Sequence, residues 1–307
     1  MAEWKKRGVL LAPGLGGDWG PTHAALPTPL LGEDDRAELF FSPRDSAGRG
    51  HIARAEIEAR PDGTLALLGV DPKPVLEPGL LGAFDDSGAT ASCAVRSGSG
   101  VYLYYTGWTR GVSVPFYFFV GVALRSEGAR QFVRVSQAPI LDRSAVDPYL
   151  TASPWVLREA DCWRMWYVSC TGWEITSSGP RHRYHLRYAE SEDGLSWERT
   201  GRVAVDYANA SEYAFSRPCV VRDEDGYKMW FSVRGDEYRL GYAESPDGLT
   251  WRRRDEAAGL APSAHGWDAE MVAYPVVFEW KRRQYLLYNG NGYGRTGVGY
   301  AIAEDSE

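Results

Sequence analysis

The sequence predicts an all-β protein, a five-bladed β-propeller with four antiparallel strands in each blade. One observation is that YAESEDGLSW (188–197) recurs as YAESPDGLTW (242–251), 54 positions later, with eight of ten residues identical. A second is that a pair of strand-like runs, joined by a polar turn, recurs five times along the 307 residues. A repeat of this length indicates one supersecondary unit used repeatedly, and short strands without helical periodicity are typical of propeller blades.

Each repeat begins with two runs that are expected to form a β-hairpin. In each pair a short apolar run and an aromatic run flank a polar turn, which is the pattern of antiparallel strands. The five pairs are LPTPLLGEDDRAELFFS (26–42), SCAVRSGSGVYLYYT (92–106), SPWVLREADCWRMWYVS (153–169), RPCVVRDEDGYKMWFS (217–232) and YPVVFEWKRRQYLLYN (274–289). Anchors of the first strands lie 57 to 66 residues apart, at Pro27, Cys93, Pro154, Pro218 and Pro275.

A third and a fourth strand complete each blade. The third strands are HIARAEI, VGVALR, HLRYAES, RLGYAES and VGYAIAE, and in two copies an Asp-Gly turn then leads to a Trp. Asp-Gly favours a hairpin because the turn needs positive φ. We therefore expect a single domain over 1–307, with blades at roughly 22–60, 83–135, 146–200, 209–255 and 266–304. A strand near Val9 to Leu11 is expected to complete the last blade and close the ring.

Composition and charge exclude several classes of partner. The net charge of −7 argues against nucleic acid, and no apolar stretch approaches the roughly 18 residues that span a membrane. Pro13 and several glycines interrupt the apolar run near the start, so we predict no signal peptide and a cytoplasmic protein. The cysteines have no metal-binding spacing and are expected to be buried reduced thiols: Cys93, Cys162, Cys170 and Cys219. The sequence carries no signal for an oligomeric state.

Acidic residues recur shortly before the first strand of a blade. In a propeller the start of the first strand and the end of the second lie on the same face, so these side chains converge near the axis. Asp86, Asp147 and Asp268 each stand seven residues before an anchor, Glu212 six and Glu270 five. The recurring Asp is interpreted either as a capping group used once per blade or as a catalytic carboxylate. Glu212 and Glu270 depart from the repeat and are the stronger functional candidates.

The loops that follow the second strands are rich in arginine and tryptophan. Arginine is a planar bidentate donor for carboxylate or phosphate, and tryptophan offers a flat face to a sugar ring. Blade one has no acid before its anchor but offers His23, either a proton carrier or a hydrogen-bonding residue of the channel. With the inner-strand residues Arg217 and Tyr274, the substrate-binding candidates are His23, Arg44, Trp108, Arg110, Trp173, Arg217, Arg234, Tyr274, Asn289 and Arg295.

The chain resembles the five-bladed propeller glycosidases, the group that contains glycoside hydrolase families 43, 32, 68 and 130. The resemblance extends over nearly the whole chain through YLYYTGW, RMWYVS, YKMWFS and the two YAESxDGLxW segments. More closely, FSPRDSAGRGHI, GAFDDSGATAS, YTGWTRGVSVPF and YNGNGYGRTGVGYA resemble bacterial glycosyl hydrolase-like proteins found near sugar-assembly genes. The resemblance implies a propeller fold and a sugar-directed activity.

The catalytic carboxylates of families 43 and 32 do not carry over to this sequence. Those families resemble one another in an Asp directly before the first-strand Pro and a Glu two residues before a later one. Here the slots directly before the anchors hold Leu26, Ser92, Ser153, Arg217 and Tyr274, and none is acidic. If the protein is a glycosidase, its acid and base must come from the five acids further upstream.

The resulting hypothesis is a glycoside hydrolase-like enzyme that acts on a sugar-containing anionic small molecule or glycan at the central channel. Glycoside cleavage needs one protonated carboxyl and one carboxylate, and Glu270 or Glu212 is proposed as the acid with Asp86 as base or nucleophile. The absent family carboxylates favour two alternatives: non-glycosidic chemistry (a lyase, cyclase or alkyl transfer) or a non-catalytic carbohydrate-binding propeller. No cofactor is expected. If the channel holds a metal, its oxygen ligands favour Ca²⁺.

Overall fold

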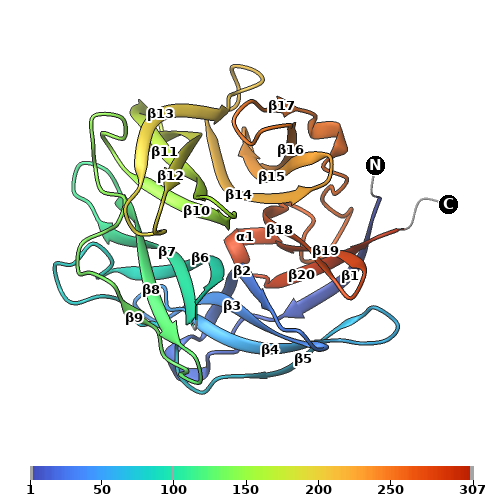
Figure 1. Ribbon diagram of the computed structural model, residues 1–307. Coiled ribbons are helices and arrows are strands. Elements are labelled where there is room, and N and C mark those ends of the chain that lie inside the picture. The colour runs from blue at the N-terminus through green and yellow to red at the C-terminus, as the bar shows by residue number, and fades with distance from the viewer. Residues whose placement is uncertain (1–2, 99, 305–307) are drawn as a thin grey trace.

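The protein is a ring of five β-sheets, each with four antiparallel strands, as the sequence predicts. The computed structural model describes residues 3–98 and 100–304. Figure 1 shows the blades arranged in chain order around a central axis. Within the described residues no helix has the length and apolar character required to span a bilayer.

The first four blades each use four strands in sequence order, and the fifth combines the two ends of the chain. The strands of the first two blades are β2 (Thr22–Leu31), β3 (Arg36–Arg44), β4 (Ala53–Ala59), β5 (Leu65–Val70), β6 (Gly88–Ser97), β7 (Gly100–Arg110), β8 (Phe116–Ser126) and β9 (Val133–Arg134). Those of the third and fourth are β10 (Thr151–Arg158), β11 (Trp163–Thr176), β12 (Gly179–Ser191), β13 (Glu198–Val205), β14 (Ala214–Asp223), β15 (Gly226–Arg234), β16 (Tyr238–Ser245) and β17 (Arg252–Arg253).

The fifth blade closes the ring. It contains β18 (Ala273–Trp280), β19 (Arg283–Asn289), β20 (Val298–Ala303) and, as its outer strand, β1 (Trp4–Leu11). β1 pairs antiparallel with β20, from Trp4 opposite Ala303 to Leu11 opposite Val298. The predicted closing strand near Val9 to Leu11 is confirmed and extends further toward the N-terminus. Because the two ends share one sheet, the ring opens only if these strand pairs break.

Four of the five inner strands contain the same backbone irregularity. The residue before the anchor proline has a left-handed conformation, with φ between 47° and 58°, in Leu26, Ser153, Arg217 and Tyr274. The strand register shifts at each of these positions. Such a conformation costs a non-glycine residue about 1–3 kcal/mol, so the surrounding contacts must hold it in place.

Side chains of neighbouring blades provide part of that support. In three of the four irregular strands, the backbone N–H of the left-handed residue donates to a polar side chain on the second strand of the preceding blade. These bonds run from Leu26 to Asn289 (2.8 Å), from Ser153 to Thr106 (2.9 Å) and from Tyr274 to Ser232 (2.7 Å). The inner strands are therefore tied around the axis by side chains as well as by packing.

The core lies between the blades and consists largely of aromatic and branched side chains. Three of the cysteines are buried free thiols, as predicted, and burial raises the pKa of Cys93 to about 11. Cys162 is only half-buried, because it lies in the exposed hairpin turn between β10 and β11. None of the four is in a disulfide.

Candidate functional site

The predicted site residues gather on one end of the ring. We call this end the axial face: it is formed by the first residues of the inner strands and by the loops that follow the second strands. Thr22 of β2 lies opposite Arg44 of β3, and Ala214 of β14 lies opposite Arg234 of β15. The short turn α1 (Asn291–Gly294) follows β19 and lies near the centre of the ring in Figure 1.

Asp147 is completely buried at the start of blade three. Its carboxylate accepts hydrogen bonds from the Tyr167 hydroxyl (3.0 Å) and the Ser169 hydroxyl (2.6 Å). It also pairs with Arg187 (3.2 Å) and Arg199 (3.0 Å) on the outer strands. Both carboxylate oxygens have hydrogen-bond or ion-pair partners, and neither is exposed. These contacts favour a structural role for Asp147 over the catalytic role considered from the sequence.

Asp268 has the same role in blade five. Its carboxylate accepts from Lys6 of β1 (2.7 Å) and from the Tyr288 hydroxyl (3.0 Å). Burial opposes its ionisation, but hydrogen bonds from Lys6, Ser263 and Tyr288 outweigh this effect and lower the pKa of Asp268. The acid therefore links the inner part of the blade to the closing strand.

In blade two this place is taken by Asp85 rather than by Asp86. Asp85 is buried and accepts from the Tyr105 hydroxyl (3.0 Å) and from Arg134 (2.7 Å). Asp86 is half-buried and accepts from Gly82 N–H (3.1 Å). The count of seven residues before the anchor therefore selected Asp86, the residue directly after the acid that occupies the equivalent buried position. The Tyr that follows each buried acid by 20 positions is the signal that would have identified it.

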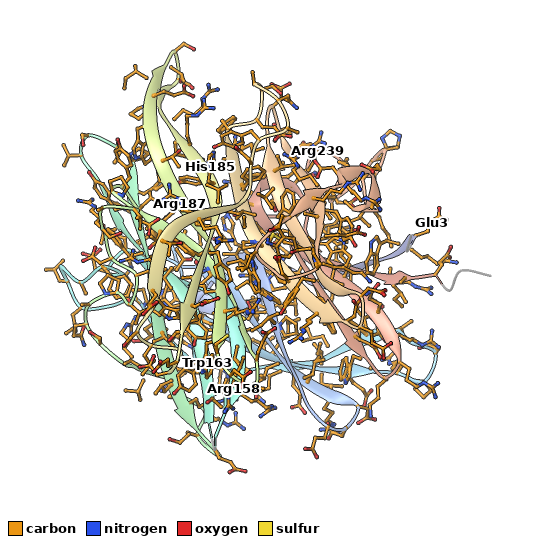
Figure 2. All side chains as sticks on the ribbon, turned by 45° about the horizontal axis from the view of Figure 1, so that its top comes forward. Glu3, Arg158, Trp163, His185, Arg187 and Arg239 are labelled. Atoms are coloured by element: carbon orange, nitrogen blue, oxygen red, sulfur yellow. The ribbon has the colours of Figure 1, made fainter. Side chains whose placement is uncertain are left out.

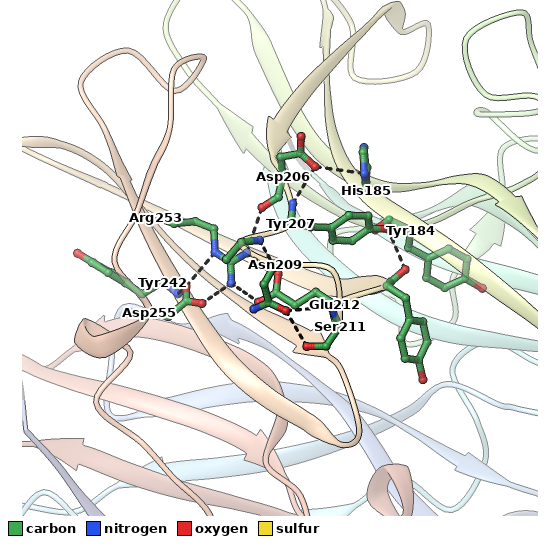
Figure 3. A network of polar contacts seen from close by, with 12 residues as sticks. Tyr184, His185, Asp206, Tyr207, Asn209, Ser211, Glu212, Tyr242, Arg253 and Asp255 are labelled. Atoms are coloured by element: carbon green, nitrogen blue, oxygen red, sulfur yellow. Dashed lines mark hydrogen bonds and ion pairs between the residues drawn. The ribbon is translucent and has the colours of Figure 1, made fainter.

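Glu212 is also held by an ion pair, here on blade four. Arg253 donates to both of its oxygens (2.7 and 3.0 Å), and Ala208 N–H donates to Oε2 (2.8 Å), as Figure 3 shows for Arg253 and its partners. The side chain is buried. Like Asp147, Glu212 is neutralised by an arginine from an outer strand of its own blade.

Glu270 differs from the other acids. Its side chain is exposed, while its backbone N–H donates to Asn291 Oδ1 (2.9 Å) and its carbonyl accepts from Arg239 (3.1 Å). No described cation lies within ion-pair distance of its carboxylate. Glu270 therefore stands beside the α1 turn with a carboxylate that is available to a ligand.

Arg234 lies in a cage of three tyrosine rings. The centre of its guanidinium is 5.3 Å from the ring centroid of Tyr238, 5.6 Å from that of Tyr213 and 5.7 Å from that of Tyr293. Its Nε is buried without a hydrogen-bond partner, and no ion pair joins it to a carboxylate in the part of the chain described. The rings fix the position of the cation and leave its donors unused.

His182 extends this cluster from the β11–β12 hairpin. Its ring stacks on Tyr184 at a centroid distance of 3.9 Å and lies 5.8 Å from Trp173. Burial, followed by the charges of Arg234 and Arg181, lowers the pKa of His182 to about 4, so the ring is neutral near pH 7. Both His182 Nε2 and Tyr184 Oη are buried without a partner among the described residues.

His23 lies in a second cationic cluster, on blade one. Burial, followed by the charges of Arg44 and Arg295, lowers its pKa to about 4. Both arginines are exposed and form no ion pair with the described carboxylates. A Cβ on Gly294 would lie 2.7 Å from that of Ala25, so glycine allows the loop to rest on β2 and bring Arg295 close to blade one.

Arg217 crosses the axis instead of facing solvent. It is 1% exposed, and its guanidinium donates to the carbonyls of Ala91 (2.8 Å) and Pro27 (2.5 Å) and to Thr28 Oγ1 (2.8 Å). Burial lowers its pKa to about 10. The side chain joins blade four to blades one and two and leaves a buried cation beneath the axial face, with no described carboxylate beside it.

The remaining predicted residues are divided between structural and accessible positions. Asn289 is buried and donates to the carbonyls of Ala24 and Gly297 (both 2.8 Å), so it holds blades five and one together. Tyr274 is half-buried, 6.0 Å from Tyr238. Arg110 is exposed and donates to Ala47 of the neighbouring blade (2.8 Å), and Trp108 lies two residues before it.

The sequence-based prediction missed several members of the Arg234 cluster: Arg181, His182, Tyr184, Tyr213 and Tyr238. They come from the long β11–β12 hairpin and from the segments around β14 and β16, outside the loops that the repeat singled out. No described group of three or more His, Cys, Asp or Glu residues is placed to hold a metal ion. The Ca²⁺ considered from the sequence therefore has no ligand set there.

Comparison with known proteins identifies relatives along the whole chain. No family model matches the sequence. Solved structures with a similar fold include a glycoside hydrolase (TM-score 0.73, 16% identity, 99% of this chain and 93% of that chain). A structure reported with family 130 glycoside hydrolases that target β-1,2 mannosidic linkages in Candida mannan has a TM-score of 0.72 (15% identity, 99% and 96%). A thermostable family 43 glycoside hydrolase has a TM-score of 0.65 (17% identity, 95% and 91%).

At these identities the structures show a shared fold, which confirms the predicted resemblance to the glycoside hydrolase propellers. Two proteins of Mycobacterium tuberculosis are much closer in sequence: uncharacterized protein MT1551 (strain CDC 1551) and uncharacterized protein Rv1502 (strain H37Rv). Each is 41% identical over 303 residues, a match that covers 98% of this chain and 99% of the relative. Because this identity extends over nearly the full length of both chains, the protein belongs to the family of MT1551 and Rv1502.

Proposed function

We propose that this protein is a glycoside hydrolase-like enzyme that binds an anionic saccharide on the axial face. The observation that carries the proposal is Arg234, a cation held among three tyrosine rings that forms no ion pair with a described carboxylate; the charge of Glu237 acts on it only from a longer distance. A guanidinium with unused donors suits bidentate recognition of a carboxylate or phosphate. The surrounding aromatic rings offer flat faces to a sugar, and the propeller neighbours are glycoside hydrolases.

For the chemistry we propose Glu270 as the general acid and Asp86 as base or nucleophile. Asp147, Glu212 and Asp268 are held in ion pairs within their own blades, whereas the carboxylate of Glu270 is exposed beside the α1 turn. Asp86 is half-buried, and among the described residues its carboxylate accepts hydrogen bonds from Gly82 N–H and the Ser87 hydroxyl. This assignment retains two of the five sequence-predicted acids, one from each of two blades.

A second candidate function is supported by the same acids. Three of the five carboxylates stabilise the fold, and the positions before the anchor prolines hold no acid. A saccharide-binding propeller, or one with non-glycosidic chemistry, needs no carboxylate pair at the axis. We further propose a cytoplasmic location, because all four cysteines are free and a reducing compartment keeps them so.

Binding is tested by calorimetry with glucose 1-phosphate, glucuronate and the neutral disaccharide maltose. We expect the anionic probes to bind more tightly than maltose, and Arg234→Ala to weaken their binding at least about 10-fold, the value of a lost charged hydrogen bond. Arg158→Ala is the matched control, since Arg158 lies over a ring, Trp163 (5.5 Å), at the end of β10 away from the axial face (Figure 2). Equal binding of maltose, or unchanged binding by Arg234→Ala, would overturn the proposal.

Hydrolysis separates the two candidate functions. Release of reducing sugar from an anionic glycoside that binds, such as an aryl glucuronide, supports the enzyme. Tight binding without any bond cleavage supports the saccharide-binding propeller instead.

A further inference from the structure

We propose that the axial face binds a saccharide with two separated anionic groups, one at each of two arginine clusters. This inference rests on the proposed function and specifies its substrate class. The first cluster is Arg234 with Arg181 and His182, and the second is Arg44 and Arg295 with His23. We call them the hairpin cluster and the loop cluster.

The hairpin cluster has buried polar atoms that the chain itself does not satisfy. Tyr184 is 5% exposed, and its hydroxyl has no hydrogen-bond partner in the described chain; the same holds for Nε2 of the neutral His182 stacked on it. A buried polar group without a partner is destabilising, so such groups are rare unless a ligand or water meets them. Arg181 is already paired with Glu174 (2.6 Å), which leaves Arg234 as the available cation.

The loop cluster supplies two further cations. Arg44 ends β3 and Arg295 follows α1; both are exposed, and neither forms an ion pair with a described acid. The nearest acid in sequence, Asp45, is occupied by Arg49 (2.9 Å) and His51 (3.2 Å). His23 is neutral and adds no charge; its Nδ1 contacts Thr22 Oγ1 (3.0 Å), which leaves Nε2 as the ring nitrogen without a partner among the described residues.

The two clusters are joined by the α1 turn. Tyr293 contacts Arg234 of the hairpin cluster (5.7 Å from guanidinium to ring), and Arg295, two residues later, belongs to the loop cluster. Arg234 of the hairpin cluster and Arg44 of the loop cluster are also both near enough to the Tyr274 hydroxyl for their charges to act on it, so the two clusters border one side chain. Gly292 and Tyr293 have φ of 65° and 61°, a left-handed pair that turns the loop back sharply between the clusters.

A further cation, Arg217, lies beneath the side chain between the clusters, and the exposed carboxylate of Glu270 lies beside the α1 turn. Tyr274 lies 6.0 Å from Tyr238 of the Arg234 cage, and its hydroxyl is close enough to Arg44 and Arg217 for their charges to favour its ionisation, although burial dominates and raises its pKa. Beneath it Arg217 is buried without a carboxylate. A single anion would neutralise one cluster and leave the other uncompensated, whereas a sugar bisphosphate or a phosphorylated sugar acid would neutralise both.

The test compares fructose 1,6-bisphosphate with fructose 6-phosphate by calorimetry, with inorganic phosphate as the reference anion. We expect the bisphosphate to bind at least about 10-fold more tightly than the monophosphate, in keeping with one more charged contact. Arg295→Ala and Arg44→Ala should each remove most of this advantage and change the affinity for the monophosphate less than about threefold. Both side chains are exposed, and an unchanged melting temperature verifies that the variants fold.

The outcomes distinguish this inference from the proposed function. Equal affinity for the two sugars, with both lost in Arg234→Ala, overturns the two-anion proposal and leaves the anionic-saccharide site intact. A loss of both ligands to the same extent in Arg295→Ala indicates one merged site and also overturns it. If neither sugar binds more tightly than inorganic phosphate, and neither glucose 1-phosphate nor glucuronate binds more tightly than maltose, the proposed function fails as well.

Discussion

Asp147 and Arg234 both lie toward the axial face, yet the charge of Asp147 is neutralised by ion pairs and that of Arg234 is not. Asp147 is enclosed by two hydroxyl donors and two arginines. Arg234 is surrounded by three tyrosine rings and forms no ion pair with an acid of the described chain. A charge that the fold already neutralises contributes to stability, whereas one that the fold positions and leaves unpaired is available to a ligand.

The same difference separates the acids from the arginines more generally. Asp85, Asp147 and Asp268 each bind a tyrosine hydroxyl of the second strand and a cation of an outer strand. In these three blades the acid ties the inner loop to the outer strands. Repetition of an acid in this protein therefore indicates a structural role, whereas the two acids that depart from the repeat differ: Glu212 is paired with Arg253, and Glu270 is exposed.

The largest expected effect is on stability, from Asp147→Asn. The change leaves Arg187 and Arg199 partly buried without their counter-ion, and breaking a buried pair costs about 3–5 kcal/mol. Urea unfolding measures the loss. Asp161→Asn, in the exposed turn between β10 and β11, is the matched control and should change stability by less than about 0.5 kcal/mol. A variant as stable as the wild type would remove the structural interpretation of Asp147.

The next largest effect is expected on turnover. It is tested by comparing Glu270→Gln with Glu212→Gln. Loss of a general acid lowers the rate about 10²- to 10⁴-fold, so Glu270→Gln should abolish most hydrolysis at an unchanged melting temperature. Glu212→Gln should instead lower the melting temperature, because Arg253 loses a bidentate partner. The measurements are the hydrolysis rate and the melting temperature of each variant. Full turnover by Glu270→Gln would exclude it as the acid.

The third expected effect is a pH dependence of stability that arises from the neutral histidines. In the folded protein the pKa of His23 and of His182 is about 4, below the ordinary value of 6.5. Between these values the unfolded chain binds protons that the folded chain does not, so stability is full above pH 6.5 and decreases as the pH falls toward 4. Urea midpoints measured from pH 7.5 to 4.5 should show this decrease.

His182→Gln provides the check on that assignment. It should make the decrease with falling pH shallower, because one of the titrating groups is removed. His265→Gln, at an exposed position, should leave the slope unchanged. An equal slope in wild type and His182→Gln would show that the decrease comes from other groups.

Much of the fold was predictable because its determinants are local. Strand pairs, turn residues and anchor positions recur along the chain, and each hairpin is specified by neighbours in sequence. Arg234, Arg295 and Glu270 were also identifiable, since their place in the repeat puts them on the axial face. The exchange of Asp85 for Asp86 shows the limit: a one-residue offset in the repeat reverses which side chain is buried.

The sequence by itself determined the number of blades, the closing strand and the face on which side chains converge, because strand alternation and turn chemistry act between near neighbours. Only the tertiary structure decided which charges are neutralised. Lys6 reaches Asp268 across 262 positions, and Tyr293 joins Tyr213 and Tyr238 around Arg234 from a different blade. Such partners meet only when the ring closes, and an arginine is neutralised or left without an ion pair according to whether a carboxylate meets it there.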